Sequence, residues 1–176
     1  MVNNIINPII PIIPNIPIIP MSINAIAVFQ GTINGTVKFI EVNNMVNIII
    51  DLKGLNKNSL HGFHVHECGD LTDGCNSACA HFNPFNTTHG CPGMKERHVG
   101  DLGNLRTDLF GNSKYMMSDN MIKLSGDNSN IIGRMLIIHQ DPDDCGQGIG
   151  ELREESLKTG NAGKRIACAI IGYAKK

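Results

Sequence analysis

Apolar and polar residues alternate over short stretches from residue 22 onward, and turn-forming residues separate these stretches. Neighbouring side chains of a β-strand point to opposite faces, so an alternation with period two predicts strands with one buried face. Asn34-Gly35 separates the first two stretches, and this pair is a strong hairpin signal because both residues tolerate positive φ. The pattern predicts strands at Ile23–Gly31, Thr36–Val42, Met45–Leu52, Leu60–Glu67, Asp101–Thr107, Ser113–Ser118, Ile131–His139 and Arg165–Ala174.

Two long segments interrupt the strand pattern. Cys68–Val99 is rich in Gly, Pro, Asn, Cys and His and has no sustained periodicity, and Gln140–Gly163 is a second long polar loop. An irregular segment of this length in a compact domain usually carries function. Many short strands with two long functional loops predict an all-β fold, namely a Greek-key, eight-stranded flattened β-barrel or immunoglobulin-like sandwich.

Residues 1–21 differ in composition from the rest, since they consist almost wholly of Ile, Pro and Asn. Repeated proline removes amide donors and blocks helix and central strand. We expect a disordered low-complexity tail, followed by one domain at 22–176. The alternatives are a native start at Met21, which would remove the tail from the protein, and a docking segment. The tail lacks the basic start and small-residue cleavage site of a secretory signal, so we expect a cytoplasmic protein, with secretion as the alternative.

The overall composition excludes some classes of function. The formal net charge is -1, so the chain lacks the basic excess with which a dedicated nucleic-acid binder neutralises phosphates. It has no Trp and only 2 Tyr, which disfavours a base-stacking platform. No uninterrupted apolar stretch approaches the ~20 residues of a bilayer-spanning helix. We therefore expect neither nucleic acid nor membrane as a partner.

Histidines form a pattern that suggests metal chemistry. His64 and His66 lie two residues apart in a predicted strand and share a face, where two neutral imidazoles can chelate copper or zinc. His139 ends an apolar strand. Each position also has an ordinary explanation: exposed strand histidines for the first two, and a core or capping histidine for the third.

A second group lies in the first long loop and at its exit. Its members are His81, His89, His98 and Asp101. Three imidazoles and one carboxylate suit a closed tetrahedral zinc site, although scattered loop histidines are common. The two groups together favour metal binding, because chance could explain each histidine position alone but not all of them at once.

Cysteine usage leaves several possibilities open. The chain has 6 Cys and no C-x-x-C pair, which disfavours a thiolate zinc module. Six cysteines in a chain of this length fit either disulfides or metal ligation, and their connectivity does not follow from the sequence.

Five segments closely resemble the copper/zinc superoxide dismutase family, in the family's order and with near-family spacing. They are GFHVHECGD (62–70), HFNP (81–84), ERHVGDLGN (96–104), IIGRMLIIH (131–139) and KTGNAGKRIAC (158–168). The resemblance covers about residues 23–174 and implies one copper and one zinc per subunit. It implies that His64, His66, His81 and His139 bind copper, and that His81, His89, His98 and Asp101 bind zinc.

The resemblance also implies roles around the metals. His81 would bridge them as an imidazolate, His61 would buttress the copper strand, and Asp143 would link His64 to His89. The channel would contain Arg165 and Thr159, and the charged electrostatic loop would contain Glu154, Glu155 and Lys158. That loop is about three residues longer than is usual, around Ile149–Arg153. The implied reaction converts two superoxide anions into dioxygen and hydrogen peroxide on copper, with zinc structural, and so protects against superoxide.

The implied disulfide joins Cys75 and Cys168. For Cys79 and Cys91, which lie in the first loop, we expect either a second disulfide or free thiols. Cys68 and Cys145 are expected as free thiols, Cys68 near the family's dimer contact. The resemblance further implies a homodimer and a copper chaperone for maturation, although Gly163–Ile166 lacks the proline of strictly chaperone-dependent members and predicts partial independence.

Two other classes of function are alternatives to this one. One is a metal-binding domain of a copper chaperone, and the other is an interaction module with an inactive site. Both are disfavoured because all the implied copper ligands and Arg165 are present and no C-x-C delivery motif exists.

Overall fold

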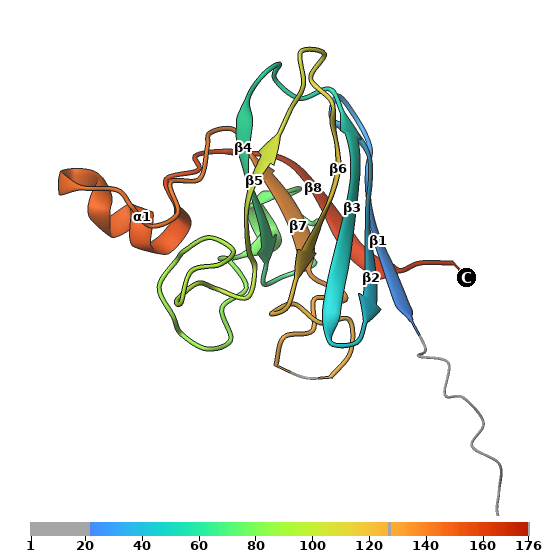
Figure 1. Cartoon of the computed structure of the whole chain (residues 1–176). Helices are drawn as coiled ribbons and strands as arrows, with labels where there is room; N and C mark the ends of the chain where they lie inside the picture. The colour runs from blue at the N-terminus through green and yellow to red at the C-terminus, as the bar shows by residue number, and fades with distance from the viewer. Residues whose placement is uncertain (1–21, 127, 176) are drawn as a thin grey trace, which may run out of the picture.

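The computed structural model describes residues 22–126 and 128–175, so the predicted tail at 1–21 lies outside the described residues. Within those residues, eight antiparallel strands follow the order β5-β4-β7-β8-β1-β2-β3-β6 (Figure 1). They are β1 Ile23–Phe29, β2 Asn34–Val42, β3 Met45–Lys53, β4 Leu60–His66, β5 Asp101–Arg106, β6 Ser113–Asp119, β7 Met135–His139 and β8 Arg165–Tyr173. The Tyr115 hydroxyl of β6 donates to the Asn104 carbonyl of β5 at 3.4 Å, which brings the two ends of the sheet together into a nearly closed barrel. The all-β prediction is confirmed.

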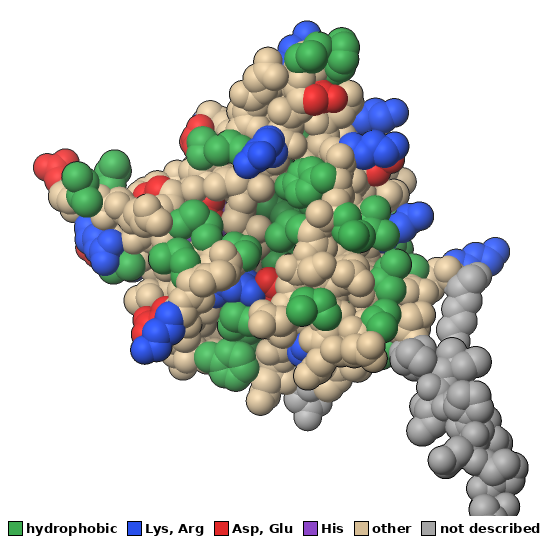
Figure 2. All heavy atoms as spheres, viewed as in Figure 1, with side chains coloured by type: hydrophobic (Ala, Val, Ile, Leu, Met, Phe, Trp, Pro, Cys, Tyr) green, Lys and Arg blue, Asp and Glu red, His purple; other side chains and the backbone are tan. Residues whose placement is uncertain are grey.

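The core follows the period-two pattern of the strands. In β3, Val46, Ile48, Ile50 and Leu52 are buried, whereas Ile49 between them is exposed. Inward-facing side chains of the other strands complete one large apolar cluster. On the outer face shown in Figure 2, basic and acidic side chains are interspersed among apolar and neutral ones.

Most strand ends lie within two residues of the sequence prediction, but the start of β7 differs by more. β7 begins at Met135 rather than Ile131, because Gly133 has a φ of +81° and the Arg134 amide donates to the Ile131 carbonyl, which makes a turn. Ile131 is nevertheless fully buried, and its apolar character looked like part of the strand.

The second long loop also contains helical structure that the pattern did not predict. Within it lie a 3₁₀ turn, η2, at Gly150–Leu152 and a short helix, α1, at Arg153–Thr159, while a further 3₁₀ turn, η1, occupies Asn76–Ala78. The helix escaped detection because it is only 7 residues long and almost wholly polar. No helix in the described part of the chain is long and apolar enough to cross a membrane.

The two long loops meet on one side of the barrel (Figure 1). His66, at the end of β4, forms a bridge with His81 in the first loop. The His89 amide donates to the Leu157 carbonyl at 2.9 Å and so joins the first loop to α1. The rigid β4–β7 pair therefore forms the base of a site that the two loops enclose.

Candidate metal centre

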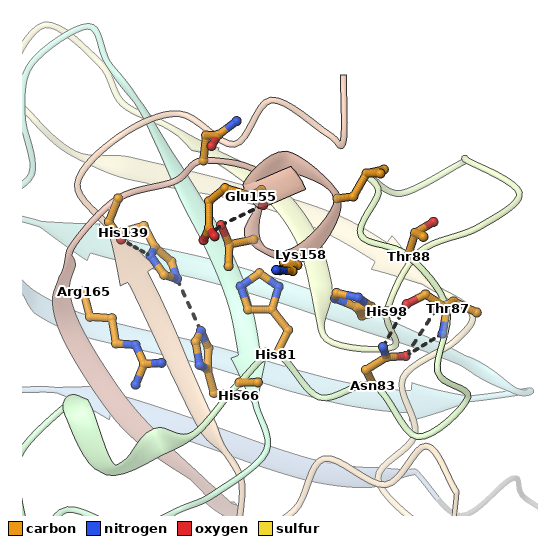
Figure 3. A pocket seen from close by; sticks show the side chains of 15 residues that line it. His66, His81, Asn83, Thr87, Thr88, His98, His139, Glu155, Lys158 and Arg165 are labelled. Carbon is orange, nitrogen blue, oxygen red and sulfur yellow. Dashed lines mark hydrogen bonds between the residues drawn. The ribbon is translucent and has the colours of Figure 1, made fainter. Parts of the chain in front are cut away.

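Four histidines converge at the end of the β4–β7 pair. They are His64 and His66 of β4, His139 of β7 and His81 of the first loop, and one ring nitrogen from each lies within 4.8 Å of the others. All four are buried. The Nε2 atoms of His66 and His139 are 3.3 Å apart (Figure 3). These histidines come from three separate segments of the chain, and the fold brings them together.

The outward nitrogens of three of these imidazoles have fixed partners. Nδ1 of His66 donates to the Cys79 carbonyl at 3.0 Å, and Nδ1 of His139 donates to the Gly163 carbonyl at 3.1 Å. Nε2 of His64 donates to Asp143 at 2.8 Å. These bonds fix the tautomer of each ring and leave the inward nitrogen as a lone-pair donor.

The inward nitrogens fit a bound metal. Nδ1 of His64 and Nε2 of His81 are buried and have no hydrogen-bond partner among the described residues. A buried polar atom without a partner is costly, and a metal ion would satisfy both nitrogens at once. A set of four neutral imidazoles suits copper.

A second group surrounds the Asp101 carboxylate, which is fully buried. The Nδ1 atoms of His81, His89 and His98 lie 2.8, 3.0 and 3.1 Å from its oxygens. The His98 amide also donates to Oδ2 of Asp101, at 2.8 Å, which fixes the orientation of the carboxylate. Three nitrogens and one carboxylate oxygen match the donor set of a tetrahedral zinc site.

Two residues connect the groups. His81 belongs to both, because its Nδ1 faces Asp101 while its Nε2 faces the first group. Asp143 accepts hydrogen bonds from His64 and from His89, each at 2.8 Å. His61 lies behind the site, where its Nδ1 donates to the carbonyl of His139 at 2.9 Å.

Burial and charge set the protonation of these groups. Burial lowers the pKa of His64 to about 3 and that of His139 to about 4, so both are neutral at physiological pH, the form that binds metals. Burial also lowers the pKa of His89, but its hydrogen bonds to Asp101 and Asp143 outweigh that effect and raise the value to about 9. Burial would raise the pKa of Asp143, but the hydrogen bonds from His64 and His89 outweigh that effect and lower the value to about 2.

A pocket of about 730 Å³ opens over His66, His81 and His139 (Figure 3). Arg165 lines it, and its guanidinium donates to the backbone carbonyls of Cys75, at 2.8 Å, and Cys79. These bonds hold a fixed positive charge beside the histidines.

The opposite wall of the pocket comes from α1, through Glu155, Lys158 and Thr159. The Thr159 hydroxyl donates to the Glu155 carboxylate at 2.7 Å. Glu154 pairs with Lys158 at 2.7 Å, but both side chains are exposed, so the pair adds little stability.

The cysteines confirm one expected pairing and give two corrections. Cys75 is bonded to Cys168, which ties the first loop to β8. The expected pairing of Cys79 with Cys91 is wrong: Cys91 is bonded to Cys145, and Cys79 is an exposed free thiol. Cys79 lies beside the end of β4, whereas Cys91 and Cys145 lie where the two long loops meet, with their Cα atoms 4.9 Å apart. The expectation of a free thiol at Cys145 is therefore also wrong.

Sequence reasoning missed two residues that hold Asp143. Asn104 donates to its carbonyl at 2.9 Å and accepts from its amide at 2.8 Å. Gly160 packs so closely that a Cβ there would lie 2.0 Å from the Asp143 carboxylate. The sequence did contain one unused signal: Cys91 follows His89 by two residues, and Cys145 follows Asp143 by two.

Comparison with known proteins is consistent with this geometry. The family model described as copper/zinc superoxide dismutase matches residues 33–171. A superoxide dismutase [Cu-Zn] of Paramecium bursaria Chlorella virus 1 is 60% identical over 154 residues, covering 88% of this chain and 80% of the relative. One of Schizosaccharomyces pombe is 51% identical over 156 residues, covering 86% and 99%.

Two further similarities concern location and fold. An extracellular superoxide dismutase [Cu-Zn] of Brugia pahangi is 51% identical over 153 residues, covering 85% of this chain and 76% of the relative. Among solved structures, a crystal structure of the clock protein EA4 superposes with a TM-score of 0.82 at 42% identity, covering 87% of this chain and 96% of the other.

Proposed function

Since the chain belongs to the copper/zinc superoxide dismutase family, we propose that its two overlapping histidine groups are the two metal sites of the enzyme. The protein is a superoxide dismutase, which converts two superoxide anions and two protons into dioxygen and hydrogen peroxide with copper and zinc as cofactors. Superoxide is its substrate.

The donor sets support one metal for each group. Copper is held by His64, His66, His81 and His139, and zinc by His81, His89, His98 and Asp101. The single observation that carries this assignment is the convergence of the ring nitrogens, with their outward nitrogens fixed by backbone carbonyls and Asp143. When bound, copper supplies the one-electron redox chemistry, while zinc contributes a fixed positive charge.

Arg165 is the residue that attracts and orients the substrate. Its guanidinium lines the pocket beside His66 and His139, and backbone carbonyls fix its position. A planar guanidinium presents several donors to a small anion. Thr159 forms the opposite wall and limits the width of the pocket there.

His81 is the residue best placed to carry a proton for the reaction. Its Nε2 is buried without a partner in the described structure, and the ring lines the pocket. Burial lowers the pKa of His81, which favours the neutral ring, and its Nε2 can hold a proton for the substrate whenever that nitrogen is not binding metal. Asp101 holds the opposite nitrogen of the ring in place.

One assay tests the proposed site. Superoxide consumption is measured for the copper- and zinc-loaded protein, for His139→Ala, and for Gln140→Ala as a control on the exposed neighbouring side chain. We expect His139→Ala to lose nearly all activity and copper, and Gln140→Ala to retain both. A His139→Ala protein as active as the parent would refute the copper assignment.

We propose that the enzyme is a homodimer formed through the junction of β8 with two adjoining loops. Backbone bonds join Gly133 to Ile171, and the Arg134 guanidinium donates to the Glu67 carbonyl, so three segments meet there. Ile170 and Tyr173 expose apolar surface in this region. Light scattering should give twice the chain mass, and Tyr173→Glu should reduce it to the chain mass at low concentration.

Maturation and location complete the proposal. A copper chaperone assists loading but is only partly required, which activity in cells lacking the chaperone would test. The enzyme acts in the cytoplasm, a location supported by the exposed free thiol of Cys79, because oxidising compartments favour paired cysteines. Secretion remains the alternative that cell fractionation would reveal. Residues 22–176 form the functional domain.

A further inference from the structure

The Cys91–Cys145 disulfide lies directly beside the zinc group. Cys91 follows the zinc ligand His89 by two residues, and Cys145 follows Asp143 by two. The two sulfur atoms and an Asp143 carboxylate oxygen all lie within 4.8 Å of one another. The Cys145 amide also donates a hydrogen bond to the Asp143 carboxylate at 2.7 Å. The same carboxylate accepts the hydrogen bond from His89, so the bridge lies next to that hydrogen bond.

This bridge joins the two long loops where few other bonds do so. Near the zinc group, the first loop contacts the second through the His89–Asp143 hydrogen bond and through the His89 amide, which donates to Leu157 at 2.9 Å. Both contacts depend on His89 itself. The disulfide is covalent and lies beside His89, so it restrains the same approach of the two loops independently of the histidine side chain.

From this placement we propose that Cys91 and Cys145 are positioning residues, whose disulfide holds His89 against Asp143 before zinc binds. The inference rests on the proposed zinc site. In the oxidised protein the first loop is already confined near its bound position, so zinc binding orders fewer residues and is tighter. Without the bridge, zinc binding itself must bring the two loops together.

The experiment measures zinc affinity by competition with a chelator, using Cys91→Ser, Cys145→Ser and the double variant. Serine variants are preferable to chemical reduction, because free thiolates beside Asp143 would themselves bind zinc. Cys68→Ser is the matched control. Cys68 is also a free thiol, and it takes part in neither of the two contacts between the long loops described above.

We expect the double variant to bind zinc about 10–100-fold more weakly than the parent, as for the loss of other groups that orient metal ligands. Each single variant also removes the bridge but leaves one thiol beside Asp143 that can bind zinc, so its loss should be no larger than that of the double variant. Cys68→Ser should bind zinc like the parent.

A second readout uses no metal. In the zinc-free parent protein, the amides of His89 and Asp144, which donate to Leu157 and Gly160, should exchange with deuterium slowly. In the bridge variants they should exchange at least about tenfold faster. Equal zinc affinity and equal exchange in parent and variants would overturn the inference. No zinc binding by the parent would overturn the metal assignment, and the inference with it.

Discussion

Gly160 offers a direct test of the link between the two loops. It lies after α1 with a φ of +67°, and a Cβ there would lie 2.0 Å from the Asp143 carboxylate and 2.5 Å from Nε2 of His89. The Gly160→Ala substitution therefore inserts a methyl group into the hydrogen bond that joins these side chains at 2.8 Å. Gly150 is the matched control, with a φ of +59° and no atom within 4 Å of its ideal Cβ.

The magnitudes follow from these environments. Alanine in the left-handed region costs about 1 kcal/mol, which is the full effect expected for Gly150→Ala. Gly160→Ala adds the loss of a charge-assisted hydrogen bond, about 1.5–3 kcal/mol, for a total of about 2.5–4 kcal/mol. It should also weaken zinc binding about 10–100-fold, because Asp143 orients His89, whereas Gly150→Ala should leave zinc affinity unchanged.

Urea unfolding of the metal-free, disulfide-bonded proteins measures the first effect, and zinc titration measures the second. Parent, Gly160→Ala and Gly150→Ala are compared under the same conditions. If the two variants lose the same stability and bind zinc equally well, the packing of Gly160 against the His89–Asp143 pair does not matter and the reasoning fails.

Three further predictions concern charge, pH and thiols. Arg165→Gln should lower kcat/KM for superoxide about tenfold and weaken its dependence on salt, measured by pulse radiolysis; an unchanged salt dependence would contradict the role of Arg165. The pKa values of His64 (about 3) and His139 (about 4) lie below 6.5, so the metal-free protein should lose up to about 1.4 kcal/mol per histidine for each pH unit below 6.5, because only the unfolded chain takes up these protons. The raised pKa of His89 (about 9) makes its contribution to stability complete below pH 6.5, and this contribution is lost as the pH rises through 9. Urea midpoints of the metal-free protein should therefore be highest near pH 6.5. Midpoints that do not change with pH would contradict the assigned burial and pairing of these histidines. Native protein should expose thiols only at Cys68 and Cys79, against 6 after reduction in denaturant, and a labelled Cys91 or Cys145 in the native protein would exclude the second bridge.

The strands could be predicted because each pattern is local. In β3, the alternation of buried and exposed side chains in the fold is the alternation in the sequence. α1 was missed because its 7 residues bury only Ser156, so they show no apolar period. Ile131 misled the prediction because tertiary packing, and not a strand, buries it.

The sequence predicted the candidate ligands and the supporting residues Asp143 and His61, but not Asn104, Gly160 or the Cys91–Cys145 bridge. His64 and His66 share a face by strand geometry alone, and His81, His89 and His98 form a loop group that suits zinc, whereas the role of His81 in both groups came from resemblance to a family. Contacts between distant segments left little local trace. The closeness of Cys91 to Cys145, and of Gly160 to Asp143, depends on how two long loops meet in space, which no periodicity records.

Anomalous diffraction from crystals of the loaded protein, collected at the copper and zinc absorption edges, tests the central claim most directly. The account predicts a copper peak among His64, His66, His81 and His139, and a separate zinc peak among His81, His89, His98 and Asp101, with His81 contacting both. Metals exchanged between the two groups, or a His81 that contacts only one of them, would contradict it.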